Sequence, residues 1–237
     1  MTSFFPLAAT VISLLFAGTL WLQYQRKHRP YLLVWFVALA IYAVAAFTEF
    51  VGSTAGWSSW LFRTYYFLGG IVLVGVLGLG TLYLLFPRVA PRALVILVAL
   101  SAIGLVSVAA AQLDPSYLDT HQVPSLRVMP LGPNLFNDLA VAMAAIINIL
   151  GTLILIGGAL WSAYGLWRRG QPGERLVANI LIATGAFIVA GASSLTRFGI
   201  YELFYVGQFA GVLIMFLGFL AASRVPSRAA LGVPAPS

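Results

Sequence analysis

The sequence predicts an all-α integral membrane protein with seven transmembrane helices. Of its 237 residues, 61% are hydrophobic and only 8% are charged, and the mean hydropathy is +0.98. Soluble domains do not reach this composition. The apolar residues are gathered in runs of about 20, which is the length a helix needs to cross a hydrocarbon core of about 30 Å. We therefore expect one seven-helix domain over residues 1–222 and a short cytoplasmic tail at residues 223–237.

Seven apolar runs predict the transmembrane helices in chain order. They cover residues 4–23, 31–51, 62–86, 93–112, 136–161, 176–198 and 201–222. The first run is expected to be retained as a helix, because its positive charge follows it at Arg26 and Lys27, whereas a signal peptide carries this charge in front. The connection at residues 113–135 contains four prolines and is too polar to span. We expect it to cap the outer end of the bundle or to contact a partner.

Basic residues mark one side of the membrane, because short cytoplasmic loops are enriched in lysine and arginine. Ten of the thirteen lie after the first, third and fifth runs and in the tail. They are Arg26, Lys27, Arg29, Arg88, Arg92, Arg168, Arg169, Arg175, Arg224 and Arg228. The N-terminus is therefore expected outside and the C-terminus inside. This topology also explains the net charge of +7, so the expected partner of these charges is the lipid bilayer and not nucleic acid.

The same features predict a multi-pass protein of a cell membrane. Arginine is strongly preferred, and Lys27 is the single lysine. This preference is typical of GC-rich bacterial genomes and favours a bacterial inner membrane.

A duplicated pattern relates the first three apolar runs to the last three. The pattern Gly-x-Leu-Trp-x-x-Tyr occurs at residues 18–24 and again at 158–164, and Thr-Glu-Phe at 48–50 is matched by Thr-Arg-Phe at 196–198. Because the matches keep the same order and orientation, they predict a parallel 3+1+3 repeat. Its parts are a first triplet at 4–86, a linker helix at 93–112, an outer loop at 113–135 and a second triplet at 136–222.

In outline this arrangement resembles the seven-helix sugar transporters of the SWEET group, and the same scheme has been suggested for microbial rhodopsins. The resemblance is one of topology. The Pro-Gln signature of the SWEET group is absent from this sequence, and no proline lies in the middle of a predicted helix. Retinal binding would need a lysine in the seventh helix, but Lys27 follows the first.

Ionisable residues at membrane depth are costly, so they are usually paired, directed into a cavity or functional. The candidate ligand-binding or ion-pair cluster near the outer helix ends comprises Glu49, Arg63, Tyr66, Asp138, Arg197, Glu202, Tyr205 and Gln208. Glu49 and Arg197 occupy equivalent positions in the two triplets and have opposite charge, so we expect them to pair. Tyr42 shares the face of Glu49 because seven residues separate them. Two roles remain open for the cluster: fastening the outer helix ends, which we favour, and binding a ligand.

Glycines supply a second signal. Gly207 and Gly211 are spaced as in the G-x-x-x-G pattern, which allows membrane helices to approach closely. We expect these two residues to pack helices within the bundle, and the alternative is a docking face for another subunit, a pigment or a lipid tail.

The chain offers few reactive groups. It has no cysteine and two histidines, His28 in an inner turn and His121 in the outer loop, so no metal site, cofactor or catalytic residue is predicted. Three functions remain open. The first is a transporter-like or receptor-like protein that binds a small solute or lipid in an outward-facing polar and aromatic cavity between the two triplets. The second is a non-catalytic subunit of a larger membrane complex, whose partner would be another membrane subunit or a second copy. An integral membrane enzyme comes third.

Overall fold

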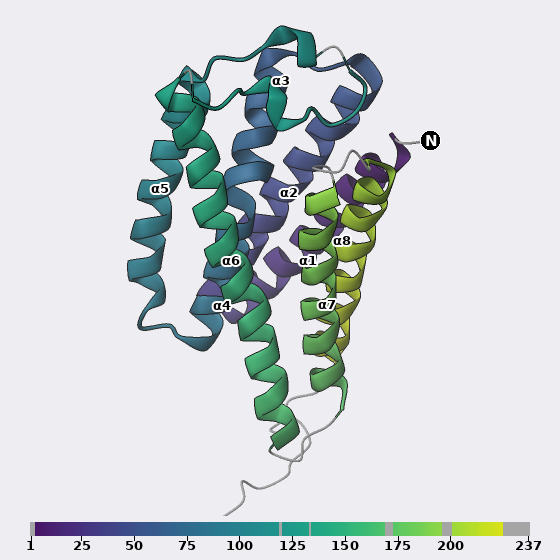
Figure 1. Ribbon diagram of the computed structural model, residues 1–237. Helices are drawn as coiled ribbons and strands as arrows, with labels where there is room; N and C mark the ends of the chain where they lie inside the picture. The colour runs from purple at the N-terminus through teal and green to yellow at the C-terminus, as the bar shows by residue number, and fades with distance from the viewer. Residues whose placement is uncertain (1–2, 119, 133, 169–172, 196–200, 225–237) are drawn as a thin grey trace, which may run out of the picture.

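The computed structural model describes residues 3–118, 120–132, 134–168, 173–195 and 201–224. Within these ranges the chain is helical apart from short connections, and no strand occurs (Figure 1). The elements are α1 (Phe4–Lys27), α2 (Pro30–Ala55), α3 (Ser59–Tyr65), the π-helix η1 (Tyr66–Val72), α4 (Leu73–Leu85), α5 (Ala90–Ala110), the 3₁₀ turns η2 (Pro115–Tyr117) and η3 (Leu126–Val128), α6 (Leu135–Arg168), α7 (Glu174–Leu195) and α8 (Tyr201–Arg224).

Six helical segments of the described chain are long and apolar enough to cross a membrane. They are α1, α2, the continuous segment Ser59–Leu85 formed by α3, η1 and α4, then α5, α6 and α8. The apolar part of α7, Leu176–Ala192, is shorter than the others. The predicted all-helical membrane character is confirmed by length and composition. The count of seven spans, the orientation and the internal repeat stay predictions.

Helix boundaries differ from the predicted ones at a few ends. The third span begins at Ser59, because the side chain of Ser58 accepts a hydrogen bond from the Leu61 amide at 3.2 Å and caps the helix. The fourth begins at Ala90. The fifth, α6, continues to Arg168 and has 34 residues, which corresponds to a length of about 51 Å. This helix is therefore longer than the hydrocarbon core, and Figure 1 shows it extending past the ends of α4 and α5.

Six of the long helices pack as a ring. Each contacts its neighbour in the order α1, α2, α4, α6, α7 and α8, and α8 returns to α1. Helix α5 packs against α4, η1 and α6, and Figure 1 shows it at the edge of the molecule. Helices that follow one another in the chain therefore pack together within each predicted triplet. The first and last helices of the chain, α1 and α8, are also in contact.

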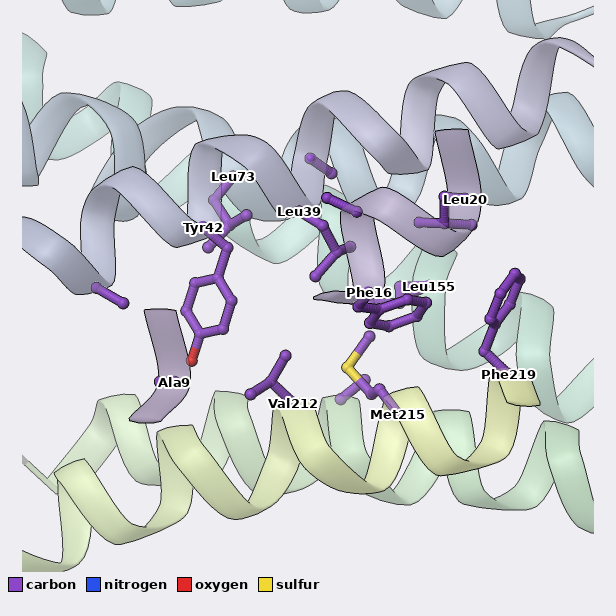
Figure 2. Packing of buried hydrophobic residues seen from close by; sticks show 14 of the residues in the cluster. Ala9, Phe16, Leu20, Leu39, Tyr42, Leu73, Leu155, Val212, Met215 and Phe219 are labelled. Carbon is purple, nitrogen blue, oxygen red and sulfur yellow. The ribbon is translucent and has the colours of Figure 1, made fainter. Parts of the chain in front are cut away.

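The ring encloses an apolar core to which every one of its helices contributes. Figure 2 shows part of this cluster. The members include Phe16 of α1, Leu39 of α2, Leu73 of α4, Leu155 of α6, Ala186 of α7 and Met215 of α8. The aromatic side chain of Phe16 stacks on that of Phe216, with the centroids of the two phenyl groups 5.0 Å apart. Because the lipid chains are as apolar as this core, close packing rather than the hydrophobic effect holds the helices together.

Glycines make two of the helix contacts close. A Cβ atom at Gly185 of α7 would lie 2.5 Å from the carbonyl oxygen of Gly211 in α8. A Cβ at Gly207 would lie 2.5 Å from the Cβ of Ala192, also in α7. Both glycines of the predicted packing pattern therefore face a helix of their own chain. The second close contact lies between α4 and α6 at Gly151, where a Cβ would lie 2.5 Å from the Val74 carbonyl oxygen.

Candidate ligand site at the capped end

The connection between α5 and α6 covers one end of the helix ring (Figure 1). We call this connection, residues 111–134, the cap, and the end of the bundle beneath it the capped end. Its buried residues Leu118, Val123 and Val128 pack with Phe62 and Phe204 of the helices below. This connection therefore covers helix ends of the bundle, and that this end is the outer one stays a prediction.

Asn137, at the start of α6, fastens the cap to the bundle. The residue is fully buried. Its Oδ1 accepts a hydrogen bond from the Gln112 amide at 2.9 Å, and its Nδ2 donates to the carbonyl oxygens of Gln112 and Pro130, each at 2.9 Å. One side chain thus satisfies three backbone groups from both ends of the cap.

The cap is also ordered from within by Asp114. The Oδ1 atom of Asp114 accepts hydrogen bonds from the Ser116 hydroxyl at 2.6 Å and from the Ser116 amide at 3.0 Å. The hydroxyl first and the amide second hold the pKa of the Asp114 carboxyl below its usual range. The Asp114 amide donates to the Val128 carbonyl oxygen at 2.9 Å and ties η2 to η3.

Beneath the cap, Glu49 of α2 lies inside the bundle, with only 7% of its surface exposed. The hydroxyl of Tyr65, the last residue of α3, is a hydrogen-bonding partner of the Glu49 carboxyl. Tyr42, seven residues earlier on α2, lies close enough to interact electrostatically with both groups. A carboxyl group and two phenols from two helices therefore share one buried region.

Two residues of α8 complete this region, which we call the polar cluster: Tyr42, Glu49, Tyr65, Tyr205 and Gln208. The Tyr42 hydroxyl donates to the Gln208 side-chain oxygen at 2.8 Å and lies 3.1 Å from its backbone oxygen. Figure 2 shows this hydroxyl pointing toward α8. The Tyr205 hydroxyl accepts a hydrogen bond from the Val123 amide of the cap at 3.0 Å, and Tyr205 interacts electrostatically with Tyr65. The polar cluster thus joins α2, α3, α8 and the cap.

The π-helix η1 begins directly after Tyr65. It rotates the side chains that follow about the helix axis, relative to their positions in a regular α-helix. Such segments have irregular hydrogen bonding and occur frequently at functional sites. Here the Nδ2 atom of Asn148 in α6 donates to the Gly70 carbonyl oxygen at 2.6 Å and to the Ala144 carbonyl oxygen at 2.7 Å. A side chain of α6 therefore satisfies a backbone group of η1.

A cleft of about 520 Å³ opens between the cap and the turn from α2 to α3. It is lined by Ala55, Gly56, Trp57, Ser58, Ser59, Pro115, Leu118, Thr120 and His121. Trp57 is 8% exposed, and within the described chain its buried indole nitrogen has no hydrogen-bond acceptor. Its ring packs on Gly52 and meets Tyr65 edge to face, with centroids 5.4 Å apart. Trp57 therefore lies between the cleft and the partner of Glu49.

The structure brings together only part of the predicted site. Glu49, Tyr205 and Gln208 belong to the polar cluster. Arg63 instead donates to the backbone at the end of α5, to the carbonyl oxygens of Val108, of Ala109 at 2.9 Å and of Ala111 at 2.8 Å. These are carbonyls that the end of a helix leaves without an intrahelical partner.

The other predicted residues have different surroundings, or lie outside the described residues. Asp138 accepts a hydrogen bond from the Gly132 amide at 2.9 Å at the start of α6. Glu202 is exposed at the start of α8, and Tyr66 stacks on Phe62. Arg197 lies outside the described residues, so the Glu49–Arg197 pair stays a prediction.

Three residues of the capped end were not among the predicted site residues. Tyr65 is the partner of Glu49, Asn137 holds the cap, and Trp57 lines the cleft. The sequence signal for Asn137 was a polar side chain at the start of an apolar run, but the neighbouring Asp138 carries the same signal. In the described part of the chain, no three His, Cys, Asp or Glu side chains gather in a way that could hold a metal ion.

Comparisons with models of protein families, with curated proteins and with solved structures found no match for this chain. The two distinctive features of the capped end are the buried carboxyl of Glu49 and the unsatisfied donor of Trp57 beside a polar cleft.

Proposed function

We propose that this chain is a multi-pass membrane protein that binds a small polar solute at its capped end, between the two helix triplets. The observation that carries the proposal is the burial of Glu49 in a membrane-spanning helix with a tyrosine of another helix as its partner. An ionisable group at this depth is costly and usually serves a ligand, an ion or a proton.

The cleft gives the solute an entrance. Ser58, Ser59, Thr120 and His121 line it and supply groups that can hydrogen-bond a polar solute. The indole N–H of Trp57 is a donor without an acceptor, and leaving such a group unsatisfied costs free energy. This nitrogen has no exposed surface, so a solute oxygen would accept its hydrogen bond, and remove that cost, only after a movement of the Trp57 side chain. The solute would then contact the ring that packs on Tyr65.

The basic turns orient the site. Arg26, Arg88 and Arg168 lie at the end of the bundle opposite the cap, and basic turns remain on the cytoplasmic side. With this orientation the cleft opens outward, and the solute arrives from outside the membrane.

The alternative role, an accessory subunit, is supported by the few reactive groups of the chain and by glycine faces that could receive another chain. Gly207 and Gly211 are instead occupied by α7 of the same chain. This close packing accounts for both glycines within the bundle and favours the solute-binding role.

Thermal unfolding in lipid nanodiscs with a panel of sugars, amino acids, amines and organic acids tests the proposal. We expect at least one solute to raise the unfolding temperature, because a ligand at about 100 times its Kd stabilises a protein by about 2.7 kcal/mol. Trp57→Phe keeps an aromatic ring but removes the N–H donor, and Glu49→Gln replaces the ionisable carboxyl group by an amide. Each should raise the Kd of that solute about tenfold, as expected for the loss of about 1.4 kcal/mol.

The matched control is Gln122→Ala, an exposed cap residue that does not line the cleft. It should leave the Kd unchanged. If no solute stabilises the protein while Glu49→Gln alone lowers the unfolding temperature, the polar cluster fastens the helix ends and the proposal is wrong.

A further inference from the structure

A second hollow lies at the other end of the bundle, on an apolar surface of two predicted membrane-spanning helices. It is a groove of about 240 Å³ between α4 and α6, and its lining is almost wholly apolar. The lining residues are Thr81, Leu82, Leu85, Phe86, Ile154, Gly157, Gly158 and Trp161. The hydroxyl of Thr81 donates to the Leu77 carbonyl oxygen at 3.4 Å and so offers little polarity to the groove.

Two adjacent glycines create the groove. A Cβ at Gly158 would clash with the side chain of Thr81, so this glycine lets α6 approach α4. A Cβ at Gly157 would meet no atom within 4 Å, so the absence of a side chain there leaves open space. The wall beside it is Trp161, which is 67% exposed.

Arginines stand at the membrane-surface end of this groove. Phe86, which lines it, ends α4, and the turn that follows is closed by hydrogen bonds from the Val89 and Ala90 amides to the Phe86 carbonyl oxygen. Arg88 lies in this turn. On the other wall, Arg168 follows Trp161 by seven residues on α6, which places it on nearly the same helix face and about 10 Å further along the axis. Both arginines are exposed.

The length of α6 places these groups at the depths that a phospholipid requires. Its 34 residues exceed the roughly 20 that cross the hydrocarbon core. We expect the segment after Trp161 to lie at headgroup level, because tryptophan and tyrosine are enriched there. Tyr164 and Trp167 of this segment are exposed, with ring centroids 6.1 Å apart. The acyl chain of a lipid would lie along Gly157 while its phosphate reached the arginines.

We propose that this groove binds an anionic phospholipid, with one acyl chain between α4 and α6 and the phosphate at Arg88 and Arg168. The apolar walls alone cannot select a lipid, because every lipid tail is equally apolar. The selection comes from the two cations at the surface, and basic pockets between membrane helices on the cytoplasmic side are suited to anionic headgroups. This proposal does not depend on the proposed solute site.

Quenching of Trp161 fluorescence by brominated lipids tests the proposal. The protein is reconstituted in phosphatidylcholine nanodiscs containing a small fraction of either brominated phosphatidylglycerol or brominated phosphatidylcholine. The share of the fluorescence that comes from Trp161 is obtained by subtracting the fluorescence of Trp161→Phe from that of the wild type. We expect phosphatidylglycerol to quench this share at about a fivefold lower mole fraction, as one arginine contact of about 1 kcal/mol would give.

Matched variants separate a specific lipid site from general surface attraction. Arg88→Gln with Arg168→Gln should abolish the preference, whereas Arg29→Gln, an exposed arginine in the turn between α1 and α2, should preserve it. Gly157→Phe should fill the groove and reduce quenching by both lipids. Gly165→Phe, at another α6 glycine without neighbours, should not. Equal quenching by the two lipids, or a preference that Arg29→Gln removes as effectively as the other two changes, would overturn the proposal.

Discussion

Replacing Gly151 by leucine should separate α4 from α6 and prevent the helix ring from closing. A Cβ at this position would lie 2.5 Å from the Val74 carbonyl oxygen and 2.9 Å from the Gly75 amide nitrogen. Both are backbone atoms, so no side-chain rotation relieves the clash. We expect a loss of about 3 kcal/mol or more in the free energy of unfolding, which corresponds to about 6–12 °C in unfolding temperature for a domain of this size.

Thermal unfolding in nanodiscs measures this effect. Gly165→Leu is the matched control, because it adds the same side chain to the same helix where a Cβ would meet no atom within 4 Å. The control should unfold at the wild-type temperature. A Gly151→Leu variant that did the same would show that α4 and α6 are not packed backbone to backbone.

Replacing Asn137 by leucine should release the cap while leaving the helices in place. Leucine is similar in size but leaves the Gln112 amide and the Gln112 and Pro130 carbonyl oxygens without their partner. A buried polar group that loses its hydrogen bond costs about 1–3 kcal/mol, so three such groups should cost about 3 kcal/mol or more. Hydrogen–deuterium exchange of the cap amides, above all Val123 and Val128, should rise sharply.

A second variant tests the two donated bonds. Asn137→Asp retains the acceptor for the Gln112 amide but turns a buried carboxylate oxygen toward the Gln112 and Pro130 carbonyl oxygens, so its cap amides should exchange at least as fast as those of Asn137→Leu. Asp138→Asn preserves an acceptor for the Gly132 amide and should exchange like the wild type. Unchanged cap exchange in Asn137→Leu would contradict the assigned role of this side chain.

The helical architecture was predictable because the bilayer restricts the choices. A backbone inside lipid must satisfy its own hydrogen bonds, so each long apolar run has to be a helix. Helix ends were less predictable. The last two turns of α6 carry Trp161, Tyr164 and Trp167, and these interfacial aromatics lower the hydropathy that marks a span without ending the helix. The start of α3 depended on the Ser58 cap rather than on hydropathy.

The polar cluster was predictable only in part. Glu49, Tyr205 and Gln208 were expected together, and the spacing from Glu49 correctly indicated the face of Tyr42. The partner of Glu49, Tyr65, was not predicted. Regular helical spacing groups Arg63 with Tyr66, whereas the structure places Tyr65 directly before a π-helix and within reach of Glu49. The hydrogen bonds of Arg63 were not predictable for a similar reason. Its acceptors lie at the end of α5, a helix that is distant in sequence.

The proposed solute site requires that the cap faces outward and the basic turns face inward. Because the chain contains no cysteine, single-cysteine variants can be labelled without background in intact cells by a membrane-impermeant maleimide. Gln122→Cys in the cap and Arg92→Cys at the start of α5 report on the two ends, and both positions are exposed. Ile147→Cys, at a site in α6 that is only 2% exposed, is the unlabelled control. We predict that Gln122→Cys is labelled in intact cells and Arg92→Cys only after permeabilisation. The reverse pattern, or labelling of both from outside, would contradict an outward-facing site beneath the cap.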